Sequence, residues 1–149
     1  MQQVLTDCVQ DLFAVQAKRT PDAIAVVADE QTLTYRELDA QAEQLAGRLT
    51  ELGICADRLV GVRLERSPEL IISLLAVLKA GGAYLPLDPT YPAERLAFMQ
   101  ADAKVSVLLT PTAPDQGSVA VERCAHNPGQ SNKSPVADPA DRLAYVIYT

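Results

Sequence analysis

The stretch from Ser67 to Asp88, SPELIISLLAVLKAGGAYLPLD, constrains the fold more than any other part of the chain. Ser67 and Pro68 suit a helix start, because a serine oxygen accepts a free backbone N–H and proline has no N–H to leave unpaired. Apolar residues then fill almost every face of the predicted helix as far as Lys79. A helix this apolar is buried on most sides, so the stretch predicts a layered domain.

Two glycines end this helix and lead into a strand. Gly81 and Gly82 supply the left-handed exit that a residue with a Cβ resists, and the apolar residues 83–87 follow as a short strand. We interpret the glycine pair as a stop signal and not as a phosphate-binding loop. Asp88 is interpreted as a turn residue, with a ligand role as the less favoured alternative.

The rest of the chain alternates between helical and strand-like patterns. Thr34 to Glu37 is a capping-box sequence, and apolar residues recur after it at intervals of three and four as far as Leu52. We predict helices over residues 5–17, 34–52, 67–79 and 92–101, and strands over 23–28, 32–34, 59–64, 83–87, 105–109 and 143–148. This alternation predicts an α/β fold with a mostly parallel sheet and helices packed on its faces.

Residues 110–141 differ from the rest in composition. Half of the chain's ten prolines lie there, together with Ser, Asn, Gln and Gly. We predict a surface loop over 110–141, with one short strand from Val119 to Glu122. The predicted strand over residues 143–148 follows it and ends the sequence without a turn or a polar tail, so we expect the chain to be part of a longer protein.

Charge and composition exclude several classes of function. The formal net charge is −6 and the basic residues are scattered, which argues against nucleic-acid binding through phosphates. The three widely spaced cysteines favour reduced thiols over disulfides. No signal sequence and no apolar run of membrane-spanning length is present. We therefore expect a soluble cytoplasmic protein with no membrane partner.

Candidate catalytic residues are few. The chain has no GxSxG, GxGxxG, GxxxxGK[ST] or HExxH motif, and His126, its one histidine, is interpreted as solvated. Glu65 and Arg66 follow a strand and would line a crevice at the strand ends or, as we favour, make local contacts. Tyr35 and Tyr84 are interpreted as packing residues. We therefore assign no catalytic residue and no metal ligand, and expect the active site to lie elsewhere.

Three segments, taken together, resemble a known family. LTYREL at 33–38, LKAGGAYLPLD at 78–88 and LAYVIYT at 143–149 are similar in sequence, order and spacing to the first, the second and the opening of the third core motif of nonribosomal peptide synthetase adenylation domains. The segments RTPDAIAV, DPTYPAERL and VSVLLT also lie at the family's usual distances. The resemblance covers about residues 10 to 149 and identifies residues 1–149 as a partial adenylation (AMP-binding) domain, cut at the start of its phosphate-loop motif.

The resemblance implies the N-terminal fragment of the large subdomain of an AMP-forming ligase. Such enzymes use ATP and Mg²⁺ to convert a carboxylate into an acyl-adenylate with release of pyrophosphate. They then pass the acyl group to the phosphopantetheine thiol of a carrier protein. The implied partners are an amino acid, ATP, the carrier protein and neighbouring synthetase domains, in the biosynthesis of secondary metabolites.

Little of the family's chemistry carries over to individual residues. Only Thr149 coincides with the phosphate loop, where its hydroxyl and backbone would contact ATP phosphates. The substrate pocket, the adenine-stacking aromatic, the ribose-binding Asp and the catalytic Lys have no counterpart in the sequence. We therefore predict that the 149-residue chain alone is inactive and binds no cofactor tightly.

Two alternatives remain open. In the first, the chain is a non-catalytic remnant or interaction module that pairs with a complementary synthetase piece through the unpaired apolar strand at 143–148. In the second, the activated carboxylate is a fatty or aryl acid, although the residues of the LKAGGAYLPLD motif favour an amino acid. The coding sequence beyond Thr149 separates the first alternative from an adenylation domain, because the latter requires an in-frame SG[ST]TG…K.

Overall fold

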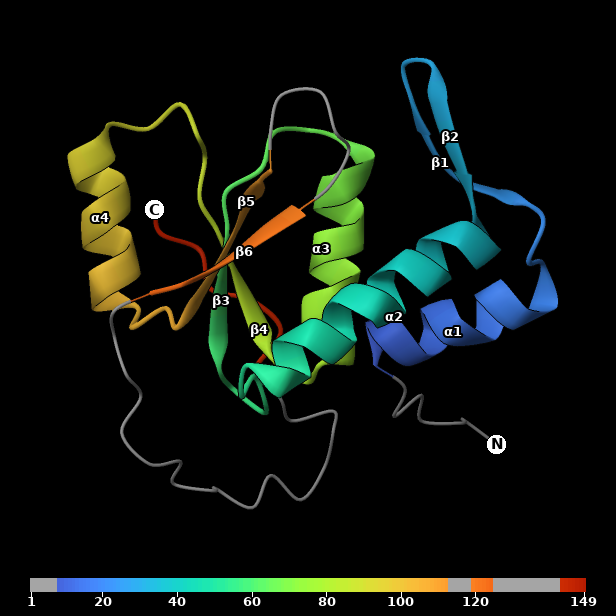
Figure 1. The fold of residues 1–149 in the computed structure, drawn as a ribbon, viewed down its shortest axis with the longest axis horizontal. Helices are drawn as coiled ribbons and strands as arrows, with labels where there is room; N and C mark the ends of the chain where they lie inside the picture. The colour runs from blue at the N-terminus through green and yellow to red at the C-terminus, as the bar shows by residue number, and fades with distance from the viewer. Residues whose placement is uncertain (1–7, 113–118, 125–142) are drawn as a thin grey trace.

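A central sheet separates two layers of helices in the computed structural model, which describes residues 8–112, 119–124 and 143–149 (Figure 1). The sheet has four strands in the order β4-β3-β5-β6. Strand β3 (Leu59–Val62) runs parallel to both β4 (Ala83–Pro86) and β5 (Val107–Pro111). Strand β6 (Val119–Arg123) is antiparallel to β5. The expected α/β fold with a mostly parallel sheet is therefore confirmed.

The helices and a separate hairpin complete the described structure. Helix α1 (Val9–Arg19) precedes the antiparallel hairpin of β1 (Ile24–Ala28) and β2 (Gln31–Thr34). The helices α2 (Tyr35–Glu51), α3 (Pro68–Lys79) and α4 (Ala93–Asp102) follow. Figure 1 shows α4 on one side of the sheet and α2 and α3 on the other.

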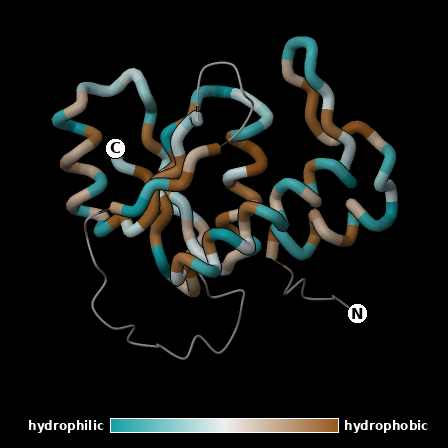
Figure 2. The backbone as a smooth tube through the Cα atoms, viewed as in Figure 1, coloured by the Kyte–Doolittle hydropathy of each residue, from teal (hydrophilic) through white to brown (hydrophobic). Residues whose placement is uncertain are grey.

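Alternation along the strands divides the core into two clusters. In β5, Val107 and Leu109 contact the cluster under α2 and α3, whereas Leu108 contacts the cluster under α4. Successive side chains of a strand point to opposite faces, so one continuous apolar strand serves both layers. Figure 2 shows the hydrophobic positions gathered along the strands and on the sides of the helices that face them.

Helix α3 forms as the sequence predicts. The Ser67 hydroxyl accepts a hydrogen bond from the Leu70 N–H at 3.4 Å, and Pro68 occupies the first turn. The helix is buried along most of its length, with Ala76 and Val77 fully inaccessible to solvent. It lies between α2 and the parallel strands, which is the buried position that its apolar composition requires.

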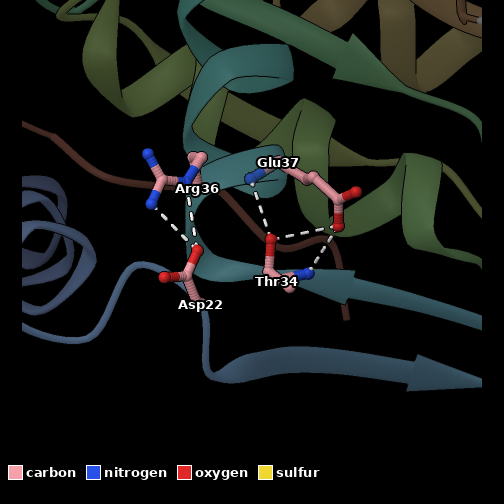
Figure 3. Close-up of polar contacts among 4 residues, drawn as sticks. All are labelled: Asp22, Thr34, Arg36 and Glu37. Carbon is pink, nitrogen blue, oxygen red and sulfur yellow. Dashed lines mark hydrogen bonds and ion pairs between the residues drawn. The ribbon is translucent and has the colours of Figure 1, made fainter.

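Helix α2 begins with the predicted capping box. Glu37 N–H donates to the Thr34 hydroxyl at 3.3 Å, and Thr34 N–H donates to the Glu37 carboxylate at 2.9 Å (Figure 3). The bond from the Thr34 backbone, followed by the bond from its hydroxyl, lowers the pKa of the Glu37 carboxyl. Arg36 pairs with Asp22 at 2.9 Å and so ties the helix start to the loop before β1.

Ion pairs connect α2 and α3 at the C-terminal end of α3. Lys79 Nζ lies 2.8 Å from the Asp39 carboxylate and 2.6 Å from the Glu43 carboxylate, and the lysine side chain is only 8% exposed. Burial by itself lowers the pKa of Lys79, but the hydrogen bonds and charges of the two carboxylates outweigh it and raise that pKa. Lys79 in the last turn of α3 thus fixes the helix against one face of α2.

The two glycines after α3 serve different purposes, which corrects the shared role predicted for them. Gly81 has a φ of +84° and provides the left-handed exit. Gly82 has no positive φ, but a Cβ there would lie 2.7 Å from Ile54 Cγ2 and 3.0 Å from the Arg58 carbonyl oxygen. This position therefore requires a glycine, because the chain before β3 passes too close to it to leave room for a Cβ.

The structure of residues 143–148 differs from the predicted strand. Residues 143–148 form one isolated bridge between Tyr145 and Tyr84 in place of a full strand, because only Tyr84 exchanges backbone hydrogen bonds with this segment. In α4, Phe98 is 62% exposed, whereas Leu96 and Met99 are buried. The short strand predicted from Val119 is confirmed as β6, while most of the loop predicted over 110–141 lies outside the described residues.

Replacing Gly82 by alanine tests the close approach. We expect Gly82→Ala to lower the free energy of unfolding by about 1–3 kcal/mol, because the new Cβ overpacks a site bounded by the Ile54 side chain and the Arg58 carbonyl oxygen. Gly47→Ala is the matched control: it lies in α2 with nothing within 4 Å of the added Cβ. It should raise the free energy of unfolding by about 0.5–1 kcal/mol. Urea unfolding measures both, and equal stability of the two variants would contradict the packing argument.

Candidate functional site

The carboxyl ends of the parallel strands define one edge of the sheet, and the candidate site lies there. The chain leaves β3 at Val62 to enter α3, and leaves β4 at Pro86 to enter α4. In Figure 1 both connections run along the upper side of the molecule. Open parallel sheets bind ligands in this position, outside the carboxyl ends of their strands.

The segment 143–149 lies beside β4 and runs in the same direction. Its parallel bridge joins Tyr145 to Tyr84. Tyr84 N–H donates to the Ala144 carbonyl at 3.0 Å, and Val146 N–H donates to the Tyr84 carbonyl at 3.0 Å. Because the segment is parallel to β4, its last residue, Thr149, lies toward the carboxyl edge of the sheet. Thr149 is exposed.

Two side chains hold this segment at its ends. Asp57, in the turn before β3, accepts a hydrogen bond from the Leu143 N–H at 2.9 Å. At the other end the Tyr148 hydroxyl donates to the Asp102 carboxylate at 2.5 Å, while Val146 and Tyr148 pack on the core cluster under α4. The sequence did not reveal these contacts, since they join positions 46 and 86 residues apart.

The loop after β4 is closed by an aspartate turn. The Asp88 carboxylate accepts hydrogen bonds from the Thr90 N–H at 2.9 Å and from the Thr90 hydroxyl at 2.7 Å. These two bonds lower the pKa of Asp88, with the backbone bond as the larger cause. Turn chemistry therefore accounts for Asp88, as the sequence predicts.

The other candidate residues are accounted for by local contacts within the fold. Glu65 and Arg66 are exposed between β3 and α3, and the Glu65 carbonyl accepts a hydrogen bond from the Ser67 hydroxyl at 3.2 Å. The Tyr35 ring contacts Phe13 at a centroid distance of 5.7 Å.

The remaining candidates are Tyr84, the three cysteines and His126. The Tyr84 ring stacks on Tyr145 at 5.6 Å, and burial raises the pKa of its phenol. Cys8, Cys55 and Cys124 form no disulfide. His126 lies outside the described residues.

A groove of about 230 Å³ lies among α2, α3 and β6. It is lined by residues of α2, α3 and β6: Gln41, Gln44, Leu45, Arg48, Glu69, Ile72 and Val119. The sheet order places β6 at the opposite end from β4 and the segment beside it. The groove is therefore separate from Thr149.

No cluster of metal-ligating side chains is found among the described residues. They contain no group of three or more His, Cys, Asp or Glu side chains arranged to hold an ion. In the same part of the chain, the helices are all too short or too polar to cross a membrane.

Comparison with protein families gives a match over residues 13–149 to the family described as "AMP-binding enzyme". A linear gramicidin synthase protein of Brevibacillus parabrevis is 49% identical over 152 residues, which cover 95% of this chain and 2% of the relative. Malpinin synthetase of Mortierella alpina is 43% identical over 151 residues, again 95% of this chain and 2% of the relative. The chain thus spans a small part of the length of these curated relatives.

Solved structures agree with this relationship. A nonribosomal peptide synthetase structure, FmoA3 bound to α-methyl-L-serine-AMP, is 42% identical with a TM-score of 0.68, covering 69% of this chain and 12% of that chain. The N-terminal subdomain of Klebsiella oxytoca NpsA, in complex with 3-hydroxybenzoyl-AMSN, is 30% identical with a TM-score of 0.65. That match covers 72% of this chain and 28% of the subdomain chain.

The chain therefore belongs to the AMP-binding enzyme family. Within that family it corresponds to an N-terminal part of a nonribosomal peptide synthetase adenylation domain. The predicted membership of an AMP-forming ligase family is confirmed, and the three motifs that carried the resemblance all lie in the matched region.

The Asp88 turn should make stability sensitive to acid. Because the folded-state pKa lies below the ordinary value of 3.8, the turn stabilises the fold above about pH 4 and this contribution is lost as the pH falls further. Urea midpoints measured between about pH 5 and pH 2 should show the gap between wild type and Asp88→Asn narrowing toward low pH. Glu30→Gln in the β1–β2 turn controls for the loss of one charge. A gap of constant size for Asp88→Asn would contradict the assignment.

Proposed function

We propose that this chain is the N-terminal portion of an adenylation domain that activates an amino acid. The complete domain would join the carboxylate of the amino acid to AMP, with release of pyrophosphate from ATP. It would then transfer the acyl group to the phosphopantetheine thiol of a carrier protein. The observation that carries the proposal is the match of residues 13–149 to the AMP-binding family together with 49% identity to a linear gramicidin synthase.

Thr149 is the residue of this chain that we assign to ATP. Its side chain is exposed, and the parallel segment beside β4 directs it toward the edge where α/β sheets bind ligands. A hydroxyl and a backbone N–H are suitable donors to phosphate oxygens, and they would act as an electrostatic support for the charge of the triphosphate. The complete domain would use Mg²⁺ together with ATP, and the described residues of this chain contain no group of three or more His, Cys, Asp or Glu side chains that could hold the ion.

The similarities favour an amino acid over another carboxylate. FmoA3, the more similar of the two solved structures, holds an amino-acyl-AMP, whereas the less similar NpsA subdomain holds a 3-hydroxybenzoyl analogue. We further propose neighbouring synthetase domains as partners and the cytoplasm as the location, because the reaction consumes ATP.

Amino-acid-dependent exchange of labelled pyrophosphate into ATP tests the proposal. The full natural polypeptide that carries this chain should catalyse exchange with at least one amino acid, and the 149-residue chain alone should not. Omission of the amino acid is the control. Exchange only with aryl or fatty acids would show that the substrate is such an acid and not an amino acid. Exchange by the isolated chain would overturn the assignment of the active site to other segments.

A second candidate function rests on the outer face of residues 143–147. Leu143, Tyr145 and Ile147 are 42%, 52% and 62% exposed, on a segment held to β4 by one bridge. An apolar edge of this kind suits the addition of another strand, so the chain would act as a module that pairs with a complementary synthetase piece. Saturable binding of the purified 149-residue chain to a separately produced remainder of an adenylation domain, with no exchange activity in any polypeptide, would favour this candidate.

A further inference from the structure

The chain just before Thr149 is held by side-chain contacts of Tyr148. The last backbone hydrogen bond of the segment within the described residues is the one from Val146 to Tyr84. Thr149 lies three positions further along the chain, a reach of about 10 Å in an extended chain. Backbone hydrogen bonds to β4 therefore do not fix the position of Thr149.

Within the described residues, the Tyr148 side chain makes two contacts: a hydrogen bond to Asp102 and packing on the core cluster under α4. The phenol donates to the carboxylate at 2.5 Å, and the ring packs on the core cluster that includes Leu96 and Met99 of α4. A hydrogen bond from a hydroxyl to an ionised carboxylate is shorter and stronger than a bond between neutral groups. The bond raises the pKa of the Tyr148 phenol.

Helix α4 supplies a firm support for this contact. Asp102 is its last residue, and Leu96 and Met99, in the preceding two turns, are buried against the sheet. The hydrogen bond thus links the residue before Thr149 to a helix that is itself fixed by the core. The ring and the hydroxyl together restrain both the position and the rotation of the chain at Tyr148.

We infer that Tyr148 and Asp102 form a positioning pair that holds Thr149 where it meets the phosphates of ATP. The inference rests on the proposed function, since Thr149 meets ATP only in an adenylation domain. The pair acts through the backbone of the segment and does not itself contact the nucleotide. Its role is to present the Thr149 hydroxyl and N–H in one orientation, so that ATP binding does not have to order them.

Three variants and one control separate this role from simple packing. Tyr148→Phe keeps the ring and removes the hydroxyl, and Asp102→Ala removes the acceptor. Asp102→Asn keeps an amide oxygen that accepts the same hydrogen bond. Tyr145→Phe is the matched control, because it makes the same chemical change on the same segment, at a residue stacked on Tyr84.

Hydrogen exchange of the full natural polypeptide that carries this chain tests the anchoring. Peptides covering residues 147–149 should exchange about fivefold faster in Tyr148→Phe and Asp102→Ala, the change expected for loss of one hydrogen bond. Asp102→Asn should lie between these variants and the wild type. Tyr145→Phe should match the wild type. Unchanged exchange in Tyr148→Phe would overturn the inference, whether or not the polypeptide is active.

Kinetics of pyrophosphate exchange in the same polypeptides tests the link to ATP. Tyr148→Phe and Asp102→Ala should each raise KM for ATP about fivefold to tenfold and leave KM for the amino acid within about twofold. The double variant should be no worse than either single variant, because both remove the same contact. A loss confined to kcat would show that the pair only stabilises the fold and would overturn the inference. An inactive wild type would instead refute the proposed function, and the hydrogen-exchange result would still decide the anchoring.

Discussion

The burial of α3 between α2 and the parallel strands is the constraint on which the rest of the structure depends. Strands β3 and β4 are joined through this helix, and parallel strands need cover on their faces because they are apolar on both sides. Ala76 and Val77 are fully buried in that layer, and the Lys79 ion pairs connect α3 to α2. Gly82 then lets the chain return to the sheet beside Ile54 without displacing it.

The core cluster under α4 is completed by residues that are distant in the sequence. Strands β4 and β5 and helix α4 supply most of it, and Val146 and Tyr148 close it from the segment beside β4. This layer therefore connects the scaffold to the one residue assigned to ATP. Under the proposed function, the chain would contribute support and a single edge of a nucleotide site. It matches 28% of a solved N-terminal subdomain.

Local chemistry accounts for the predictions that succeeded. The start of α3 at Ser67 and Pro68, the capping box of Thr34 and Glu37 and the exit at Gly81 each depend on hydrogen bonds or dihedral angles within a few residues. Their patterns are complete in the sequence. The segment at 143–148 was predicted as a strand from its apolar composition, but strand formation requires a partner, and Tyr84 alone provides one.

The order of the elements, the two-sided burial of the sheet and, through three motifs, the family of the protein follow from local patterns in the amino-acid sequence. Tertiary structure decided which segments meet: the contact of Lys79 with Asp39 and Glu43, the close approach of Gly82 to Ile54, and the bond between Tyr148 and Asp102. The physical reason is that helix caps and apolar periodicity are local properties of the chain. A contact between distant residues exists only after the layers have packed and have brought the two side chains within reach.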